Sequence, residues 1–134
     1  VFSLKEHFPD LAITINGGIK TIDECKEMLK KVEGVMLGRA CMDDPYILAS
    51  VDNRIYNDGS KILSRDECFE KVVEYTEKYV SEGRKLHHLG NHIINMFNGC
   101  KGARRFRNYL SCHMHELGAG PDVLVQAYNK MKEA

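Results

Sequence analysis

The pattern that most constrains the fold lies near the start of the chain, where two short apolar runs flank one helix signal. The runs occupy residues 11–15 and 32–37, and both contain β-branched residues. Between them, Thr21 with Glu24 three residues later matches a capping box, which predicts a helix from there to about Lys31. A strand, a helix and a second strand make a βαβ unit, so we expect the two strands to pair in parallel.

A parallel pair of strands is not expected to stand alone, because parallel sheets are normally covered on both faces and contain several strands. We therefore interpret residues 1–52 as the last two β/α units of a TIM barrel, and hence as part of a longer protein. A strand edge and apolar helix faces left bare in such a piece would need a second copy, or the missing part of the barrel, to cover them.

The pattern changes after a polar connector at residues 53–64, and the rest of the chain is typical of helices. Ser64 and Glu67 match a second capping box, Gly83 and Gly99 mark two helix ends, and Pro121 suits the first turn of a last helix. The third helix is expected to bury Ala103, Phe106, Leu110, Met114 and Leu117. Residues 53–134 are therefore predicted to form a C-terminal four-helix bundle, which makes the fold class α/β plus all-α.

The composition restricts the compartment and the kinds of site. The 134 residues include five cysteines with no C-x-x-C pair, which favours reduced thiols and a cytoplasmic protein, with an organelle as the alternative. No apolar run is long enough for a membrane span, so no membrane partner is expected. His88 and His92 have a spacing that can bind zinc, but no third ligand follows, and no metal site is predicted.

Two glycine-containing bends follow the predicted strands and suggest a phosphate site. Asn16, Gly17 and Gly18 end the first strand, and Gly38 with Arg39 ends the second. Ligands of parallel barrels lie at the carboxyl ends of the strands, and bare backbone N–H groups beside a helix N-terminus attract anions. The alternative is a pair of tight turns with a solvated arginine.

The charge distribution favours a nucleic-acid partner. Residues 84–115 carry six lysines and arginines and no aspartate or glutamate, although the net charge of the whole chain is zero. On the predicted third helix, Arg104 and Arg107 lie opposite the apolar stripe, with Arg105 on its flank. Such a face suits the phosphates of an RNA backbone, and the alternative is a basic face that only contacts water.

Three stretches carry a resemblance to a known family: "INGGIKT", "GVMLGRACMDDPYILASVD" and "HHLGNHIINMFNGCKGARRFRNYLS". Together they resemble the tRNA-dihydrouridine synthases, most closely the A-type subfamily. The resemblance implies an FMN-dependent enzyme that uses NADPH to reduce D-loop uridines of tRNA to dihydrouridine. It also implies that Asn16, Gly17, Gly18, Gly38 and Arg39 bind the FMN phosphate, and that Arg104 and Arg107 contact tRNA.

The resemblance places the catalytic residues of the family upstream, so none is expected in this chain, and the chain alone is predicted to be inactive. Asn91 stands where relatives usually carry an arginine, which weakens one expected RNA contact. Two alternative functions fit the same residues. One is an RNA-binding helical module without a catalytic role, and the other is a different FMN-dependent barrel, such as a dihydroorotate-dehydrogenase-like enzyme.

Overall fold

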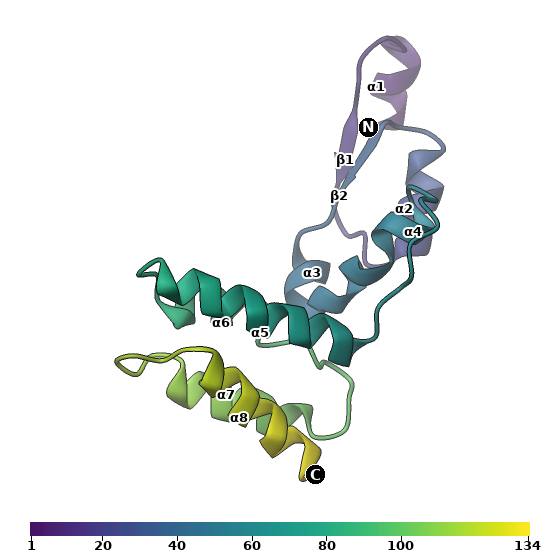
Figure 1. The fold of residues 1–134 in the computed structure, drawn as a ribbon. Coiled ribbons are helices and arrows are strands. Elements are labelled where there is room, and N and C mark those ends of the chain that lie inside the picture. Colours follow the sequence, from purple (N-terminus) through teal and green to yellow (C-terminus); the bar gives the residue numbers. More distant parts are fainter. The chain divides into compact units, whose positions relative to one another are not determined.

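The computed structural model describes residues 1–134, and the chain forms two compact units that alternate along the sequence (Figure 1). The first unit comprises Val1–Cys41 and Ile47–Ile62, and the second comprises Met42–Tyr46 and Leu63–Ala134. The short segment 42–46 thus belongs to the helical second unit. The functional division at residues 52 and 53 stays a prediction.

The first unit is built around the predicted βαβ unit. Strand β1 (Thr14–Asn16) pairs in parallel with β2 (Gly34–Met36), and α2 (Ile22–Leu29) connects them. Both strands are shorter than the predicted runs, but their parallel pairing is confirmed. Gly34 leaves room for the side chain of its partner Thr14, since a Cβ there would lie 2.5 Å from the Thr14 hydroxyl oxygen.

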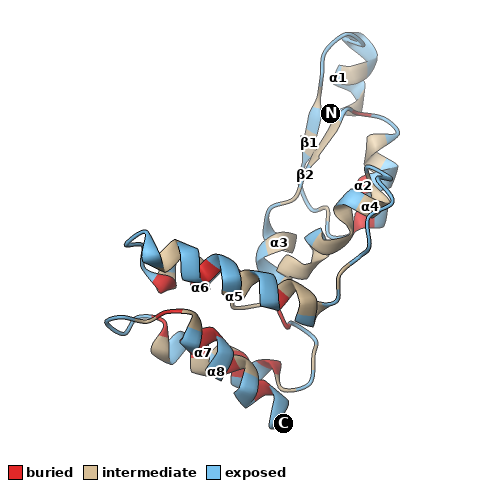
Figure 2. Cartoon of the chain, viewed as in Figure 1, coloured by how far each residue is buried: buried red, intermediate tan, exposed pale blue.

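The rest of the first unit consists of short helices around a small core. They are α1 (Phe2–His7), α3 (Arg39–Asp43), which continues into the second unit, the 3-10 helix η1 (Pro45–Ser50) and α4 (Val51–Arg54). Ile22, Cys25 and Val32 are the only buried apolar residues of this unit, and most of its surface is pale blue or tan in Figure 2. About half of the Phe8 and Met36 surface is exposed. A strand pair with so little cover agrees with the expectation of a partial sheet.

The second unit contains the four expected helices: α5 (Arg65–Ser81), α6 (Leu86–Ile93), α7 (Ala103–His113) and α8 (Pro121–Lys132). Their facing sides form one core that centres on the aromatic rings of Phe69, Phe97 and Phe106. The ring of Tyr128 stacks on Phe69 with 4.8 Å between ring centroids. Burial of this set is the main stabilising contribution to the unit.

The helix boundaries agree with the sequence signals at most ends. Both predicted capping boxes, at Thr21 and at Ser64, are confirmed. The third helix was expected to continue to Gly118, but α7 ends at His113. Leu117 therefore lies beyond the helix with its side chain fully exposed, and its predicted place in the core was wrong.

Candidate functional site

The two glycine bends leave the sheet at the same edge. Asn16 is paired with Met36 at the carboxyl ends of the two parallel strands, so the bends that follow each strand start side by side. Gly17 has a φ of 127° and Gly18 a φ of 69°, a backbone that other residues rarely adopt. The structure thus brings together the bends that contain the five predicted phosphate-binding residues.

The bends also have the free donors and the space that a phosphate requires. The N–H group of Gly18 donates no hydrogen bond to another group of the chain, and Gly17 follows the last pair of the parallel strands. A Cβ built on Gly17, Gly18 or Gly38 would meet no atom within 4 Å, so the surface beside them is open. Arg39 is exposed and has no ion pair. This donor set fits the phosphate end of FMN.

The N-terminus of α2 contributes less than the sequence suggested. The Glu24 carboxylate accepts hydrogen bonds from the backbone N–H groups of Lys20 (2.6 Å) and Thr21 (3.1 Å). The Thr21 hydroxyl in turn accepts one from the Glu24 N–H at 3.1 Å. A negative charge of the chain itself thus lies where the anion was expected to benefit from the helix dipole. An anion bound at this edge would therefore need donors other than those that Glu24 occupies, such as the glycine amides and Arg39.

In the second unit, α7 presents the predicted arginine face to solvent. Arg104 and Arg105 are exposed, Arg107 is half-buried, and none of the three forms an ion pair or a side-chain hydrogen bond with the chain. The opposite side of the helix carries the buried residues Ala103, Phe106 and Leu110. Three cations without an internal counter-ion remain available to an external polyanion.

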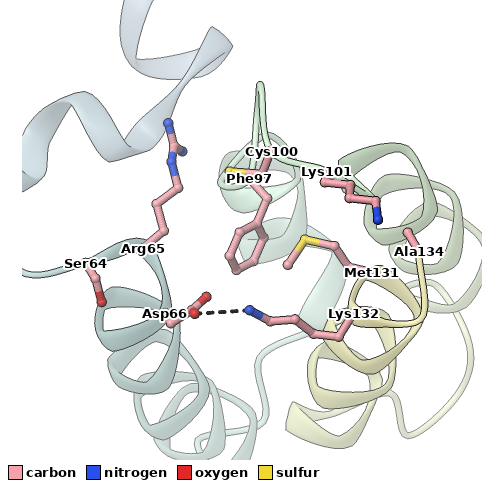
Figure 3. A pocket seen from close by; sticks show the side chains of 9 residues that line it. All are labelled: Ser64, Arg65, Asp66, Phe97, Cys100, Lys101, Met131, Lys132 and Ala134. Carbon is pink, nitrogen blue, oxygen red and sulfur yellow. Dashed lines mark hydrogen bonds and ion pairs between the residues drawn. The ribbon is translucent and has the colours of Figure 1, made fainter.

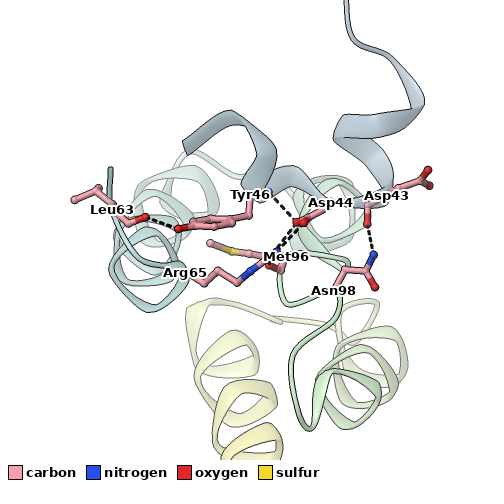
Figure 4. A network of polar contacts seen from close by, with 7 residues as sticks. All are labelled: Asp43, Asp44, Tyr46, Leu63, Arg65, Met96 and Asn98. Atoms are coloured by element: carbon pink, nitrogen blue, oxygen red, sulfur yellow. Dashed lines mark hydrogen bonds and ion pairs between the residues drawn. The ribbon is translucent and has the colours of Figure 1, made fainter. Parts of the chain in front are cut away.

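A network of polar contacts holds segment 42–46 in the helical unit (Figure 4). Both terminal nitrogens of Arg65 donate to Asp44, at 2.8 and 2.7 Å, and one of them also donates to the Met96 carbonyl. The guanidinium lies over the Tyr46 ring, 4.3 Å from its centroid, and the Tyr46 hydroxyl donates to the Leu63 carbonyl. The hydrogen bonds to Asp44 raise the pKa of Arg65, so the guanidinium stays charged. Its charge is already paired with the Asp44 carboxylate.

A cavity of about 430 Å³ lies between the start of α5 and the end of α8 (Figure 3). Lys132 crosses it and pairs with Asp66 at 3.1 Å, and the Arg65 guanidinium points away toward Asp44. Of the cationic side chains in the lining, only Lys101 lacks an internal partner. The charges in the lining of this cavity largely compensate each other. The cavity is therefore a weaker candidate for an anion site than the glycine bends.

The structure groups histidines in a way that their spacing did not reveal. His88 and His92 were considered as a pair, but His88 contacts the ring of His87, and His87 stacks on His115. No group of three or more histidine, cysteine or carboxylate side chains is placed to hold a metal ion. The contact between His87 and His115 joins α6 to the segment after α7, so only the tertiary fold could show it.

The chain contains a parallel β/α unit with glycine bends at its strand ends, followed in sequence by helices with an arginine face. It is therefore an α/β protein, consistent with part of a TIM barrel. The family model described as "Dihydrouridine synthase (Dus)" matches residues 1–132, and the chain belongs to this family. None of its helices combines the length and the hydrophobicity that a membrane crossing requires.

Several curated relatives are similar over nearly the whole chain, and each is named tRNA-dihydrouridine(20/20a) synthase. The protein of Haemophilus ducreyi is 40% identical over 133 residues, which is 99% of this chain and 41% of the relative. That of Pseudomonas aeruginosa is 43% identical over 124 residues, 92% of this chain and 37% of the relative. That of Vibrio vulnificus is 38% identical over 132 residues, 98% of this chain and 40% of the relative. The chain thus spans about two fifths of the length of these relatives.

Proposed function

We propose that this chain is the C-terminal part of an FMN-dependent tRNA-dihydrouridine synthase that uses NADPH to reduce D-loop uridines of tRNA. Residues 1–52 would be the end of its FMN-binding TIM barrel, and residues 53–134 a four-helix tRNA-binding domain. The names of the relatives suggest positions 20 and 20a as the uridines to test first. The observation that carries the proposal is the pairing of Asn16 with Met36, which starts two glycine bends at one sheet edge.

The bends would hold the phosphate end of FMN. The amides of Gly17 and Gly18 would donate to phosphate oxygens, and Arg39, at the start of the next bend, would supply a guanidinium that can donate two parallel hydrogen bonds. When bound, FMN supplies the redox chemistry that saturates the 5,6 double bond of uracil. The residues of this chain orient the cofactor through its phosphate and do not touch the uracil ring.

None of the cysteines of this chain is proposed as the acid that protonates the uracil ring. Burial raises the pKa of the Cys25, Cys41 and Cys68 thiols, and none of the three lies in a glycine bend. The family resemblance places the acid in a part of the enzyme that this chain does not contain. We therefore expect no dihydrouridine when the chain alone is incubated with FMN, NADPH and unmodified tRNA, and turnover would contradict the proposal.

The arginine face of α7 would bind the tRNA backbone. Arg104 and Arg107 lie near the start of an 11-residue helix, where N–H groups also favour phosphate, and no carboxylate competes for them. A protein that reduces a base must unstack it, and a separate grip on the backbone helps to meet that cost. Binding of tRNA to α7 would thus depend on charge, and the affinity should fall steeply as the salt concentration rises.

The salt dependence of tRNA binding tests the proposal. Each phosphate contact contributes about one unit to the slope of log K against log salt concentration, so Arg104→Ala with Arg107→Ala should make the slope shallower by about two units. Arg54→Ala is the matched control, because Arg54 already pairs with Asp23 and lies in the first unit. Equal slopes for the double variant and the control would contradict an RNA contact on α7.

The cofactor site is tested in the intact protein by comparing FMN with riboflavin, which lacks the phosphate. We expect Arg39→Ala to weaken FMN binding and to leave riboflavin binding unchanged. A loss that is equal for both would refute the phosphate role of Arg39. If the intact protein binds tRNA but neither flavin, it is an RNA-binding module, and if the α7 arginines do not affect turnover, a different flavin-dependent barrel is favoured.

A further inference from the structure

Three histidines of the helical unit form a contiguous cluster, which we call the histidine cluster: His87, His88 and His115. The rings of His87 and His115 are stacked, with 4.9 Å between centroids and 24° between planes. The ring centroid of His88 lies 4.2 Å from that of His87. His87 is partly buried, and the other two are exposed. His87 thus lies between the two other rings and contacts both.

The surroundings of the cluster contain cations but no paired carboxylate. The groups that act on His87 are His88 and Lys85 from its own helix and His115 from the segment after α7. Partial burial, followed by these neighbours, lowers the pKa of His87. The nearest acid in sequence, Glu116, pairs instead with His113 at 2.7 Å. No carboxylate is among the groups that act on His87, so a bound anion would supply the charge that compensates a proton there.

The histidine cluster continues the arginine face of α7. Arg104, Asn108 and Ser111 follow one another at three- or four-residue intervals, so they lie along one side of α7, and His115 follows two residues after the end of this helix. The Ser111 hydroxyl donates to the Asn108 carbonyl, and both residues are exposed. From His115 the surface passes directly to His87 and His88 through the ring contacts.

We propose that the histidine cluster is a second contact for the RNA backbone, in which a protonated imidazole binds a phosphate, so that RNA binding takes up a proton. This inference rests on the proposed function, since it extends the tRNA face of α7. In the free protein, proton uptake by one ring is opposed by its neighbours and by Lys85. A phosphate at the cluster reverses that opposition, because the opposite charge favours the protonated imidazole.

The size of the effect follows from linkage between proton and RNA binding. If RNA raises the pKa of one imidazole in the cluster by one unit, the affinity for RNA increases about tenfold as the pH falls through the two pKa values. Because the cluster adds one phosphate contact only on protonation, the salt slope should also be steeper by about one unit at pH 5.5 than at pH 7.5.

The experiment measures tRNA affinity of the chain at pH 5.5 to 7.5 and 0.1 M salt. The wild type should bind about tenfold more tightly at the low end, and His87→Gln with His115→Gln should remove this dependence. His7→Gln is the matched control, because His7 lies in α1 of the first unit. If the double variant loses secondary structure, the single variant His88→Gln, at an exposed position, is measured in its place.

Two results would overturn the inference: a wild-type affinity that does not change with pH, or an unchanged pH dependence in the histidine variants. Imidazole titration by nuclear magnetic resonance gives an independent reading, since RNA should raise the pKa of His87. Failure of the proposed function would look different. In that case, Arg104→Ala with Arg107→Ala would leave RNA binding unchanged at every pH.

Discussion

The contact between Asp44 and Arg65 should be one of the strongest polar interactions in the helical unit. It consists of two parallel charge-assisted hydrogen bonds, and the side chains retain only 34% and 22% of their exposure. Hydrogen bonds to charged groups contribute about 1.5–3 kcal/mol when buried, and the remaining exposure favours the lower end. We therefore predict a coupling free energy of about 2 kcal/mol between the two residues.

A double-mutant cycle with Asp44→Ala and Arg65→Ala measures this coupling in urea unfolding, followed by far-ultraviolet circular dichroism. Asp44→Ala alone should cost about 3 kcal/mol, because it leaves the partly buried guanidinium without its counter-ion. The pair Asp23 and Arg54 is the matched control, since it is much more exposed and should show a coupling below about 0.5 kcal/mol. Equal couplings for the two pairs would refute the view that the Asp44–Arg65 contact holds segment 42–46 in place.

Three further predictions concern stability, measured by urea or thermal unfolding. Gly102→Ala should cost roughly 2 kcal/mol more than Gly99→Ala, because both have φ near +80° but only the former places a Cβ 2.2 Å from a carbonyl of α8; equal costs would contradict this packing. Phe106→Ala should cost about 3–5 kcal/mol and Leu117→Ala nearly nothing, and a large effect at Leu117 would restore its place in the core. The hydrogen bond from Lys5 of α1 lowers the pKa of Glu33. This interaction therefore contributes fully to the free energy of unfolding above about pH 5, and its contribution is lost below about pH 4. Glu33→Gln should make the free energy of unfolding depend less on pH in that window.

The sequence predicted those parts of the fold that depend on local signals. The capping boxes at Thr21 and Ser64 each combine a hydroxyl and a carboxylate at fixed spacing, and both helices begin where these residues indicate. The parallel pairing followed from the helix signal between the two apolar runs, since a strand, a helix and a second strand form a βαβ unit. In each case the interacting groups lie within one helix or one βαβ unit, so the chemistry that selects the structure is visible along the chain.

The errors arose where a regular pattern continued beyond the element that it described. Leu117 fits the helical spacing of Phe106, Leu110 and Met114, but α7 ends before it, at His113. The Glu116 carboxylate pairs with His113, and Ala119 donates to the Glu116 carbonyl, so the chain turns there. Periodicity reports which side a residue would occupy in a helix and does not report whether the helix reaches it.

The histidine cluster and the contact of Asp44 with Arg65 could not be predicted for a different reason. His87 and His115 are separated by 28 positions, counted as 115 minus 87, and Asp44 and Arg65 by 21. Neither spacing brings two side chains into contact within a single helix or strand. Such pairs become visible only when the fold brings two elements together, so sequence patterns predict the α7 arginine face but not the groups beside it.

The α2 N-terminus illustrates a conflict between two sequence signals that were both read as favourable. A capping box predicts a stable helix start, and a helix start predicts an anion site. In this chain the Glu24 carboxylate meets both conditions at once, because it accepts from Thr21 and Lys20 and supplies the negative charge itself. An acidic capping residue therefore competes with an external phosphate for the same donors. The amides of Gly17 and Gly18 lie outside the box, which is why the proposed FMN phosphate site is built on them rather than on the donors that Glu24 occupies.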